Sequence, residues 1–437
     1  MTRRVGPVAT CVVALVATAA CTGGGSSGGG SSEGPAPPGL TSTQITIGST
    51  QPLSGVASAG YSEIALASAA YFKYVNDSGG INNRTIDYRY VDDRYNPGRT
   101  AVQTRKLVGE DVFAMFDALG TATHQKVVDL LNNRHVPDVF VGSGCPCWDR
   151  VHAHPYTFGW QPSYTVEGKI LGAYIRHNIP RKKKVALFYQ DDDFGRSGAR
   201  GVAHELSHKR IVSRQSYRPG TTDISKQVRR LQAAKADVIV SFSVPAFTAI
   251  LRLNMLRLKY DAKLVVSSAG SDPTTLAGVL KAIAVTAHQK VDSVKLIQGI
   301  VTDTFLPSPA NTDNSWVQLF RKVHDKYIPK LPFDGNVEYG MAAAYTFAEA
   351  LRAAGPDPTR DGLVAAIERG LPAGPGLTPL RYSATSHEGY SGVQVGVIRG
   401  RALSLLGTPA TTDSADGPVR PYDRPQPTAP ADGIPPG

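Results

Sequence analysis

Apolar positions along the chain follow two different spacings. Every second residue of segment 85–91 is apolar (Ile86, Tyr88, Tyr90), which is typical of a strand with one solvated face. Apolar residues of segment 61–77 recur every three or four positions, which predicts an amphipathic helix. Further strands are expected at 45–49, 112–118, 139–141, 185–189, 211–217, 238–242 and 264–267. Further helices are expected at 99–108, 124–133, 165–177, 197–208, 224–234 and 246–258.

This alternation of strands and helices predicts the fold class. Strands separated by helices of such length form right-handed βαβ units and parallel sheets that are covered on both faces. Because there are two such series, we expect an α/β protein with two doubly wound parallel-sheet lobes. Ligands of open parallel sheets bind beyond the carboxyl ends of the strands. The loops at those ends are 49–60, 119–123, 142–148, 191–195, 243–247 and 267–272.

Both ends of the chain differ in composition from this body. Residues 1–20 combine an early positive charge with an apolar run that is too short to span a bilayer comfortably, which predicts an export signal. Small residues precede Cys21, and this junction resembles a bacterial lipoprotein cleavage site, although Thr18 departs from that pattern. We therefore expect Cys21 to be lipidated. Residues 21–42 are rich in Gly, Ser and Pro and predict a flexible tether, whereas the Pro- and Asp-rich residues 408–437 predict a disordered tail.

The net charge of +11 bears on nucleic-acid binding, and the four cysteines bear on how the fold is held together. Part of the positive charge lies in residues 176–230, which include a run of four basic residues at 181–184. No aromatic interleaving or RNA-binding motif accompanies this run, so we interpret it as solvated surface and expect no nucleic-acid partner. Only Cys145 and Cys147 lie in the body, so the hydrophobic core must hold the fold together.

Several motifs, taken in order, resemble the type I periplasmic binding proteins, and among them the leucine/isoleucine/valine-binding branch. The motifs lie at 45–48, 52–55, 75–84, 91–97, 106–108, 136–137, 156–158, 194–195 and 338–340. The resemblance implies two lobes joined by a three-segment hinge. Lobe 1 would comprise 43–160 and 301–380, and lobe 2 would comprise 161–300 and 381–407. It also implies that the protein delivers its ligand to an ABC permease in the membrane.

The resemblance also implies a set of ligand-binding residues. Thr121 and Thr123 match a loop that binds a ligand carboxylate with hydroxyl and backbone N–H groups; Thr123 alternatively only caps the next helix. The next matching loop is Ser143, Gly144 and Cys145. In lobe 2 the match places Phe194 over the ligand. The glutamate that binds an ammonium group in amino-acid binders falls near Ala269, so that carboxylate is missing unless Asp272 replaces it. The loss argues against an ordinary α-amino acid, because an unpaired buried ammonium costs several kcal/mol.

Other candidate residues have two interpretations each. Trp148 either stacks on a planar ligand or packs in the wall, and Phe247 (like Tyr61 and Tyr339) either faces the cleft or belongs to the core. Cys145 and Cys147 form a local disulfide or remain inert thiols; with the nearby histidines their spacing fits no common metal motif, so no metal is expected. The aspartates at 191–193 are expected to form a strand-to-helix turn rather than a cation site.

These observations together predict a non-enzymatic protein that binds a small solute. No Gly-x-Ser-x-Gly, phosphate-loop or His-Glu-x-x-His motif is present. We expect a monomeric solute-binding lipoprotein of an ABC importer on the extracytoplasmic face of a bacterial membrane, without cofactor. Its ligand is an amino acid, amide, carboxylate or aromatic acid. A surface-tethered sensor domain that signals to a receptor and a secreted hydrolase remain the alternatives.

Overall fold

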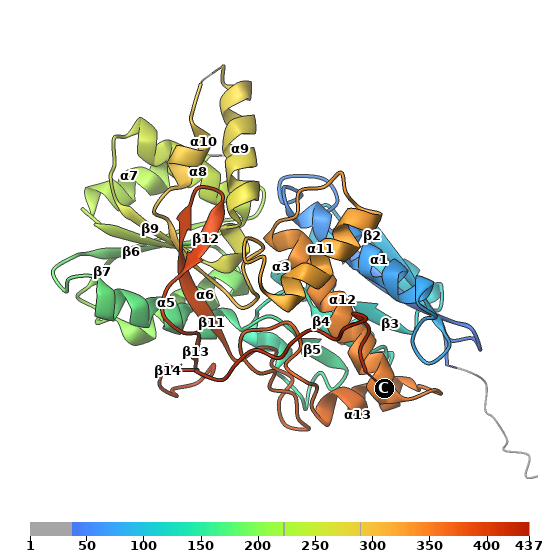
Figure 1. Ribbon diagram of the computed structural model, residues 1–437. Coiled ribbons are helices and arrows are strands. Elements are labelled where there is room, and N and C mark those ends of the chain that lie inside the picture. The colour runs from blue at the N-terminus through green and yellow to red at the C-terminus, as the bar shows by residue number, and fades with distance from the viewer. Residues whose placement is uncertain (1–36, 222, 289, 437) are drawn as a thin grey trace, which may run out of the picture. The chain divides into compact units, whose positions relative to one another are not determined.

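The computed structural model describes residues 37–221, 223–288 and 290–436. The export signal at 1–20, the lipidation site Cys21 and most of the tether therefore lie outside the described residues. Within the described part, the chain forms two sheets with helices packed around them (Figure 1). The α/β class and the two parallel-sheet lobes predicted from the alternation of strands and helices are confirmed.

The sheet of lobe 1 contains five parallel strands in the order β2-β1-β3-β4-β5. The strands are β1 (Gln44–Gln51), β2 (Thr85–Asp92), β3 (Ala114–Phe116), β4 (Asp138–Val141) and β5 (Thr157–Gly159). The helices between them are α1 (Tyr61–Asp77), α2 (Pro97–Gly109), α3 (Thr121–His124) and α4 (Val128–Asn133). Every residue of β3, β4 and β5 is buried, as expected for a parallel sheet with both faces covered.

The sheet of lobe 2 has the strand order β14-β13-β11-β10-β9-β8-β6-β7, and β12 pairs with β11. Its parallel strands are β6 (Val185–Gln190), β7 (Ile211–Tyr217), β8 (Val238–Phe242), β9 (Lys263–Val266) and β10 (Val301–Thr304). Antiparallel strands extend it: β11 (Gly392–Arg399), β12 (Ala402–Leu405), β13 (Ala410–Thr411) and β14 (Arg420–Pro421). The helices of this lobe are α5 (Tyr164–Asn178), α6 (Asp193–Glu205), α7 (Ser225–Ala233), α8 (Pro245–Arg257), α9 (Pro273–Thr286) and α10 (Ser293–Ile297).

Between β1 and β11 the chain crosses between the two lobes three times. The first crossing joins β5 to α5. The second leads from β10 back to lobe 1, where α11 (Ser315–Tyr327), α12 (Gly335–Ala354) and α13 (Arg360–Glu368) follow. The third leads from α13 to β11. In lobe 1, α12 packs on α1, where the Ser68 hydroxyl donates to the Gly340 carbonyl at 2.9 Å. A Cβ at Gly340 would collide with the Ile64 carbonyl, so this helix contact requires glycine.

Two of the predicted boundaries differ from the structure. Residues 301–304 form β10 in the sheet of lobe 2, so the second crossing begins after Thr304 rather than before Val301. The C-terminal segment, residues 408–436, is not a disordered tail. Its strand β13 pairs with β11, and its backbone accepts hydrogen bonds from side chains of both lobes. The composition of the segment does not show these partners, because they come from distant parts of the chain.

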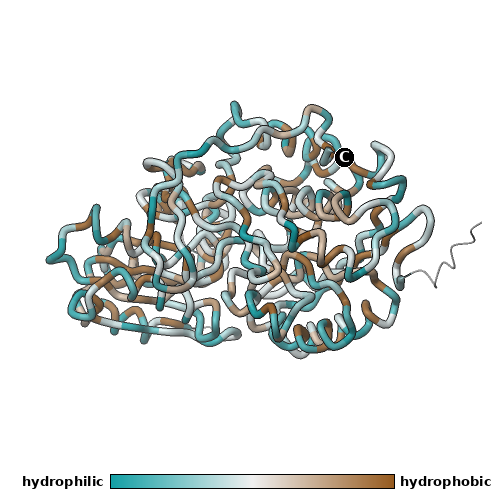
Figure 2. Tube along the Cα trace, turned by 90° about the horizontal axis from the view of Figure 1, so that it is seen from below, coloured by the Kyte–Doolittle hydropathy of each residue, from teal (hydrophilic) through white to brown (hydrophobic). Residues whose placement is uncertain are grey.

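Side-chain caps start several of the helices near the carboxyl ends of the strands. Ser163 caps α5, Asp192 caps α6 and Asp272 caps α9, each by accepting from the backbone N–H three residues further on. The aspartates at 191–193 thus form the expected strand-to-helix turn. Figure 2 shows apolar stretches inside the lobes and hydrophilic stretches at their periphery. No helix of the described residues is long and apolar enough to cross a membrane.

Candidate functional site

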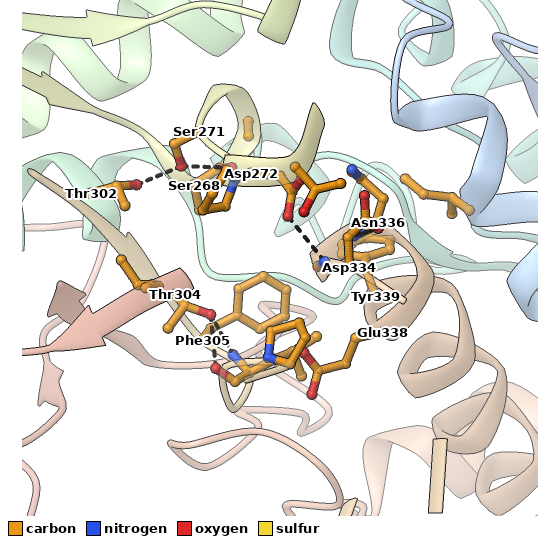
Figure 3. Close-up of a pocket in the computed structure, with 18 of the residues that line it drawn as sticks. Ser268, Ser271, Asp272, Thr302, Thr304, Phe305, Asp334, Asn336, Glu338 and Tyr339 are labelled. Atoms are coloured by element: carbon orange, nitrogen blue, oxygen red, sulfur yellow. Dashed lines mark hydrogen bonds between the residues drawn. The ribbon is translucent and has the colours of Figure 1, made fainter. Parts of the chain in front are cut away.

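A cavity of about 320 Å³ lies between the two lobes (Figure 3). Five of the six loops predicted at the strand ends contribute to its wall, and the sixth ends immediately before the lining residue Tyr61. Lining residues from those loops are Leu119, Gly120, Gly142, Phe194, Val244, Ser268, Ala269, Ser271 and Asp272. The crossing after β10 and the start of α12 complete the wall. The cavity is therefore shared between the lobes, as the position of the strand ends predicts.

Aromatic side chains form much of the cavity wall. Tyr61, Tyr95, Tyr164, Phe194, Phe305, Phe333 and Tyr339 line it. The rings of Tyr164 and Phe194 are 4.5 Å apart, and the ring of Tyr339 packs edge-on against Trp160 behind the wall at 4.9 Å. Burial raises the pKa of Tyr61 and Tyr339 well above the usual tyrosine range, so both hydroxyls stay neutral. This wall suits an apolar or aromatic body with a few hydrogen-bonding groups.

Acidic side chains gather where α12 begins. Asp334 caps α12, accepting from the backbone N–H groups of Asn336 at 3.0 Å and Val337 at 3.1 Å. Burial, together with the charges of Asp272 and Glu63, raises the pKa of Asp334 to about 8. Burial also raises the pKa of Glu63 to about 6, while a hydrogen bond from Asp334 opposes that change. The carboxyl of Glu338 follows one turn into the helix and points to the same cavity (Figure 3).

A second pair of carboxyls shapes the wall of lobe 2. Glu167 on α5 accepts from the backbone N–H of Ser268 at 2.6 Å and from its hydroxyl at 2.7 Å. Asp303 on β10 accepts from the same N–H at 3.0 Å. Burial raises the pKa of both carboxyls, and the adjacent Glu167 raises that of Asp303 further. The pair holds the loop at 267–270 against the cavity.

Several hydrogen bonds join the lobes around the cavity. The Tyr61 hydroxyl donates to the Ala269 carbonyl at 2.6 Å. The Gly335 N–H, at the start of α12, donates to Asp272 Oδ2 at 3.0 Å, and the Asn336 side chain donates to the Thr275 hydroxyl at 2.9 Å. Each of these bonds has one partner in each lobe. The two lobes are therefore in contact in this structure, and the cavity lies between their facing surfaces.

Three of the ligand-binding residues predicted from the sequence line this cavity: Phe194, Ala269 and Asp272. Both carboxylate oxygens of Asp272 already accept hydrogen bonds. Its Oδ1 accepts from the Thr275 N–H at 2.7 Å, and its Oδ2 accepts from the Gly335 N–H in the other lobe. It therefore acts as a cap and as a contact between the lobes. Tyr61 and Tyr339, which had two interpretations, also line the cavity.

The hydroxyls predicted in lobe 1 lie behind the wall. Thr121 is fully buried, and its Oγ1 lies 2.7 Å from Ser143 Oγ. Thr123 donates back to the Leu119 carbonyl at 2.8 Å. Neither threonine lines the cavity, nor does Ser143. Gly120 has a φ of 107°, which suits glycine, and Leu119 and Gly120 line the cavity instead.

The remaining predicted residues lie away from the main cavity. Ser143, Gly144, Cys145 and Trp148 line a separate crevice of about 10 Å³. Trp148 is buried, and its indole N–H donates to the Ser143 carbonyl at 3.0 Å, so it packs in the wall. Phe247 stacks on Tyr217 at 3.9 Å in the core of lobe 2. Cys145 and Cys147 form a disulfide.

Several cavity residues were not predicted from the sequence. They are Tyr95, Gln161, Tyr164, Phe305, Arg321, Asp334 and Glu338. Glu338 stands directly before Tyr339 in a motif used to recognise the family, but the motif does not indicate which side chain faces the cavity. Among the described residues, no group of three or more His, Cys, Asp or Glu side chains could hold a metal ion.

Comparison with known proteins identifies the family. A family model described as periplasmic binding protein matches residues 44–401. A Leu/Ile/Val-binding protein homolog from Brucella melitensis is 23% identical over 198 residues, which cover 45% of this chain. The aligned part spans only about half (53%) of that relative.

Solved structures share the fold. A substrate-binding periplasmic protein from Ralstonia solanacearum has a TM-score of 0.72 and 23% identity, covering 83% of this chain and 100% of its own. A fatty acid ABC transporter substrate-binding protein from Thermomonospora curvata has a TM-score of 0.75 and 20% identity, covering 87% of this chain and 95% of its own. A branched-chain amino acid ABC transporter structure from Thermus thermophilus with bound valine has a TM-score of 0.73 and 19% identity, covering 86% of this chain and 98% of its own. On the family match and these shared folds, the chain belongs to the periplasmic binding protein family.

Proposed function

We propose that this protein is the extracytoplasmic substrate-binding component of an ABC importer and captures one small amphipathic molecule between its lobes. The single observation that carries the proposal is the cavity of about 320 Å³, whose wall comes from both lobes. A ligand bound there contacts both lobes at once and therefore favours the closed arrangement over the open one.

The character of the wall supports a ligand with an apolar body and a polar group. Aromatic side chains cover much of the cavity, and carboxyl and hydroxyl groups are also among its lining. The named relatives are described by different ligands: one is a Leu/Ile/Val-binding protein homolog, one structure holds valine, and one is the substrate-binding protein of a fatty acid ABC transporter. We propose that the ligand is a branched-chain amino acid, or a short-chain or aromatic compound of similar size.

We further propose that the bound ligand is released unchanged. The described residues that line the cavity include no histidine and no cysteine. The hydroxyls of the wall thus lack an imidazole base, which hydrolytic triads usually supply. Incubation of the protein with esters and amides of candidate ligands, followed by mass spectrometry, would contradict this proposal if it showed turnover.

A ligand screen tests capture in the cavity. The protein is screened by thermal shift against branched-chain amino acids, amides, amines, fatty acids and aromatic acids, because a ligand that binds the native state raises the melting temperature. Hits are titrated by calorimetry against Ala269→Trp, which fills the cavity from its wall, and against Ala282→Trp on the exposed face of α9 as a matched control.

We expect Ala269→Trp to abolish binding and Ala282→Trp to bind as the unaltered protein does. Equal binding by both variants would contradict capture in this cavity.

Membrane attachment is tested separately. We propose that a lipid on Cys21 holds the protein at the outer face of the membrane. In the native host, Cys21→Ser should move the protein from the membrane fraction to the soluble extracytoplasmic fraction. Retention of this variant in the membrane fraction would exclude lipidation of Cys21 as the anchor.

A further inference from the structure

One buried carboxyl in the cavity has no partner. Glu338 lies in the first turns of α12, is 1% exposed and lines the cavity. Among the described residues, nothing forms a hydrogen bond or an ion pair of 4 Å or less with its carboxyl, and its Oε1 is completely buried. Leaving such a group unpaired is costly, because burial removes its hydrogen bonds to water. Figure 3 shows Glu338 on the cavity side of α12, facing the loop that contains Phe305.

The other carboxyls of the cavity wall have partners. Asp272 accepts from two backbone N–H groups, and Asp334 caps α12 by accepting from the backbone N–H groups of Asn336 and Val337. Asp303 accepts from the Ser268 N–H. These contacts explain the first three acidic residues by their roles in the fold. They leave Glu338 as the acidic group of the wall that the folded chain itself does not use.

The charges around Glu338 favour a positive partner. Asp334 and Asp272 lie close enough for their charges to raise the pKa of Glu338, in addition to the larger effect of burial. The opposing cation is Arg321, but its guanidinium covers the Phe333 ring at 4.4 Å and donates to the Pro309 carbonyl at 3.0 Å. A cation that enters the cavity would therefore favour the ionised form of these carboxyls, while Arg321 is engaged with other partners.

We propose that Glu338 binds a cationic N–H group of the ligand, such as a primary ammonium, and that the ligand is an organic amine whose apolar part lies against the aromatic wall. This inference rests on the proposed function and narrows its ligand class. It supplies, from lobe 1, the carboxylate that the sequence lacks near Ala269 in lobe 2. An α-amino acid is therefore again an acceptable ligand if its carboxylate finds donors elsewhere.

Binding of such a ligand includes one proton transfer. The amine enters as an ammonium ion, the protonated Glu338 carboxyl gives its proton to solvent, and an ion pair between carboxylate and ammonium remains. A neutral or anionic ligand gives no reason for this proton to leave. Proton release on binding is therefore a signature of the proposed contact.

The test uses sets of compounds that differ only in charge. The full chain is titrated with 2-phenylethylamine, 2-phenylethanol and 3-phenylpropanoate, and with 3-methylbutylamine, 3-methylbutanol and 4-methylpentanoate. Calorimetry at one pH in two buffers of different ionisation enthalpy measures the protons released. The variant is Glu338→Gln, and the matched control is Glu349→Gln, a buried glutamate of the same helix that does not line the cavity.

The expected result is that at least one amine binds more tightly than its alcohol and its carboxylate, with proton release. Glu338→Gln should weaken amine binding about a hundredfold, because it removes one partner of a buried ion pair. Glu349→Gln should bind as the unaltered protein does. The proton release is measured on the unaltered protein, so it tests the inference even if Glu338→Gln fails to fold.

Two results would overturn the inference. Alcohols or carboxylates that bind at least as tightly as the amines, without proton release, would show that the cavity takes another ligand class. Amine affinity that Glu338→Gln leaves unchanged would show that the amine binds elsewhere. In either case, loss of binding in Ala269→Trp would leave the proposed function intact. If no compound of any charge binds here or in the wider ligand screen, the proposed function fails with the inference.

Discussion

At the scale of single residues, buried carboxyl groups make the stability of this protein depend on pH. Burial raises the pKa of Glu349 to about 8, and burial with nearby charges raises that of Asp334 to about 8. The native state thus keeps protons that the unfolded chain releases at lower pH. The stability that these protonated groups contribute is complete in acid and is lost as the pH rises towards and through 8.

The pH dependence can be measured on a single variant. We expect the melting temperature to fall between pH 5 and pH 8, and Glu349→Gln to reduce that fall, because glutamine does not titrate. For a chain of this size each kcal/mol corresponds to about 2–4 °C. Differential scanning calorimetry at several pH values measures both slopes. Equal slopes in the variant and the unaltered protein would show that Glu349 titrates normally.

Thr121 provides a second test at this scale. Its hydroxyl pairs with Ser143 at 2.7 Å behind the cavity wall. Thr121→Val should therefore lower the free energy of unfolding by about 1 kcal/mol and change ligand affinity by less than about threefold. Chemical denaturation and calorimetric titration measure the two quantities. A tenfold or greater loss of affinity at unchanged stability would instead return Thr121 to the binding site.

The residues of the site were only partly predictable from the sequence. The family resemblance indicated Phe194, Ala269 and Asp272, and all three lie in strand-end loops, which chain topology places beside the cavity. The sequence did not indicate that the Thr121 hydroxyl turns away, since that depends on the backbone at Gly120. It also did not indicate Glu338, whose exposure to the cavity depends on how α12 packs on α1. Side-chain direction, rather than chain topology, was the missing information.

At the scale of elements, the C-terminal segment is held by contacts to both lobes. In lobe 2, Lys169 on α5 is completely buried, and its Nζ donates to the carbonyls of Asp413, Ala415 and Gly417 at 3.0, 2.8 and 2.6 Å. In lobe 1, the Tyr71 hydroxyl donates to the Gly433 carbonyl at 2.8 Å. The segment therefore runs from one lobe to the other.

Replacing Lys169 by an uncharged residue tests how much its hydrogen bonds to the C-terminal segment stabilise the protein. Lys169→Met should lower the free energy of unfolding by about 3 kcal/mol, because it leaves three carbonyls and Asp413 without their common partner. Lys73→Met is the control. Its ion pair with Asp77 is exposed, and its loss should cost less than about 1 kcal/mol. Urea denaturation compares the two variants, and equal losses would show that the segment contributes little.

The order of this segment explains a limit of prediction at the element scale. The expected strands and helices of residues 45–267 were found close to their predicted positions, because their apolar spacing reports a face that must be buried. The exception is the helix expected at 124–133, where α3 ends at His124 and α4 begins at Val128. The segment at 408–436 contains few large apolar residues, so its composition predicted disorder. Its order instead comes from β13 pairing with β11 and from Lys169, both far away in the sequence.

At the scale of the whole molecule, capture depends on how strongly the lobes prefer contact. The bond from Tyr61 to the Ala269 carbonyl is one direct link between them. Tyr61→Phe removes only this hydroxyl, so we expect ligand dissociation to accelerate and affinity to fall about fivefold. Tyr327→Phe, which loses a bond to Asp77 on the surface of lobe 1, should leave both unchanged. Stopped-flow dissociation rates that are equal in the two variants would contradict this role of Tyr61.

The most direct test of capture between the lobes is a crystal structure of the protein with the compound that gives the largest thermal shift. We predict density for that compound within the cavity, in contact with Phe194 and Ala269 of lobe 2 and with Tyr339 of lobe 1. Density for the compound on an outer face, with only water in the cavity, would contradict the central claim.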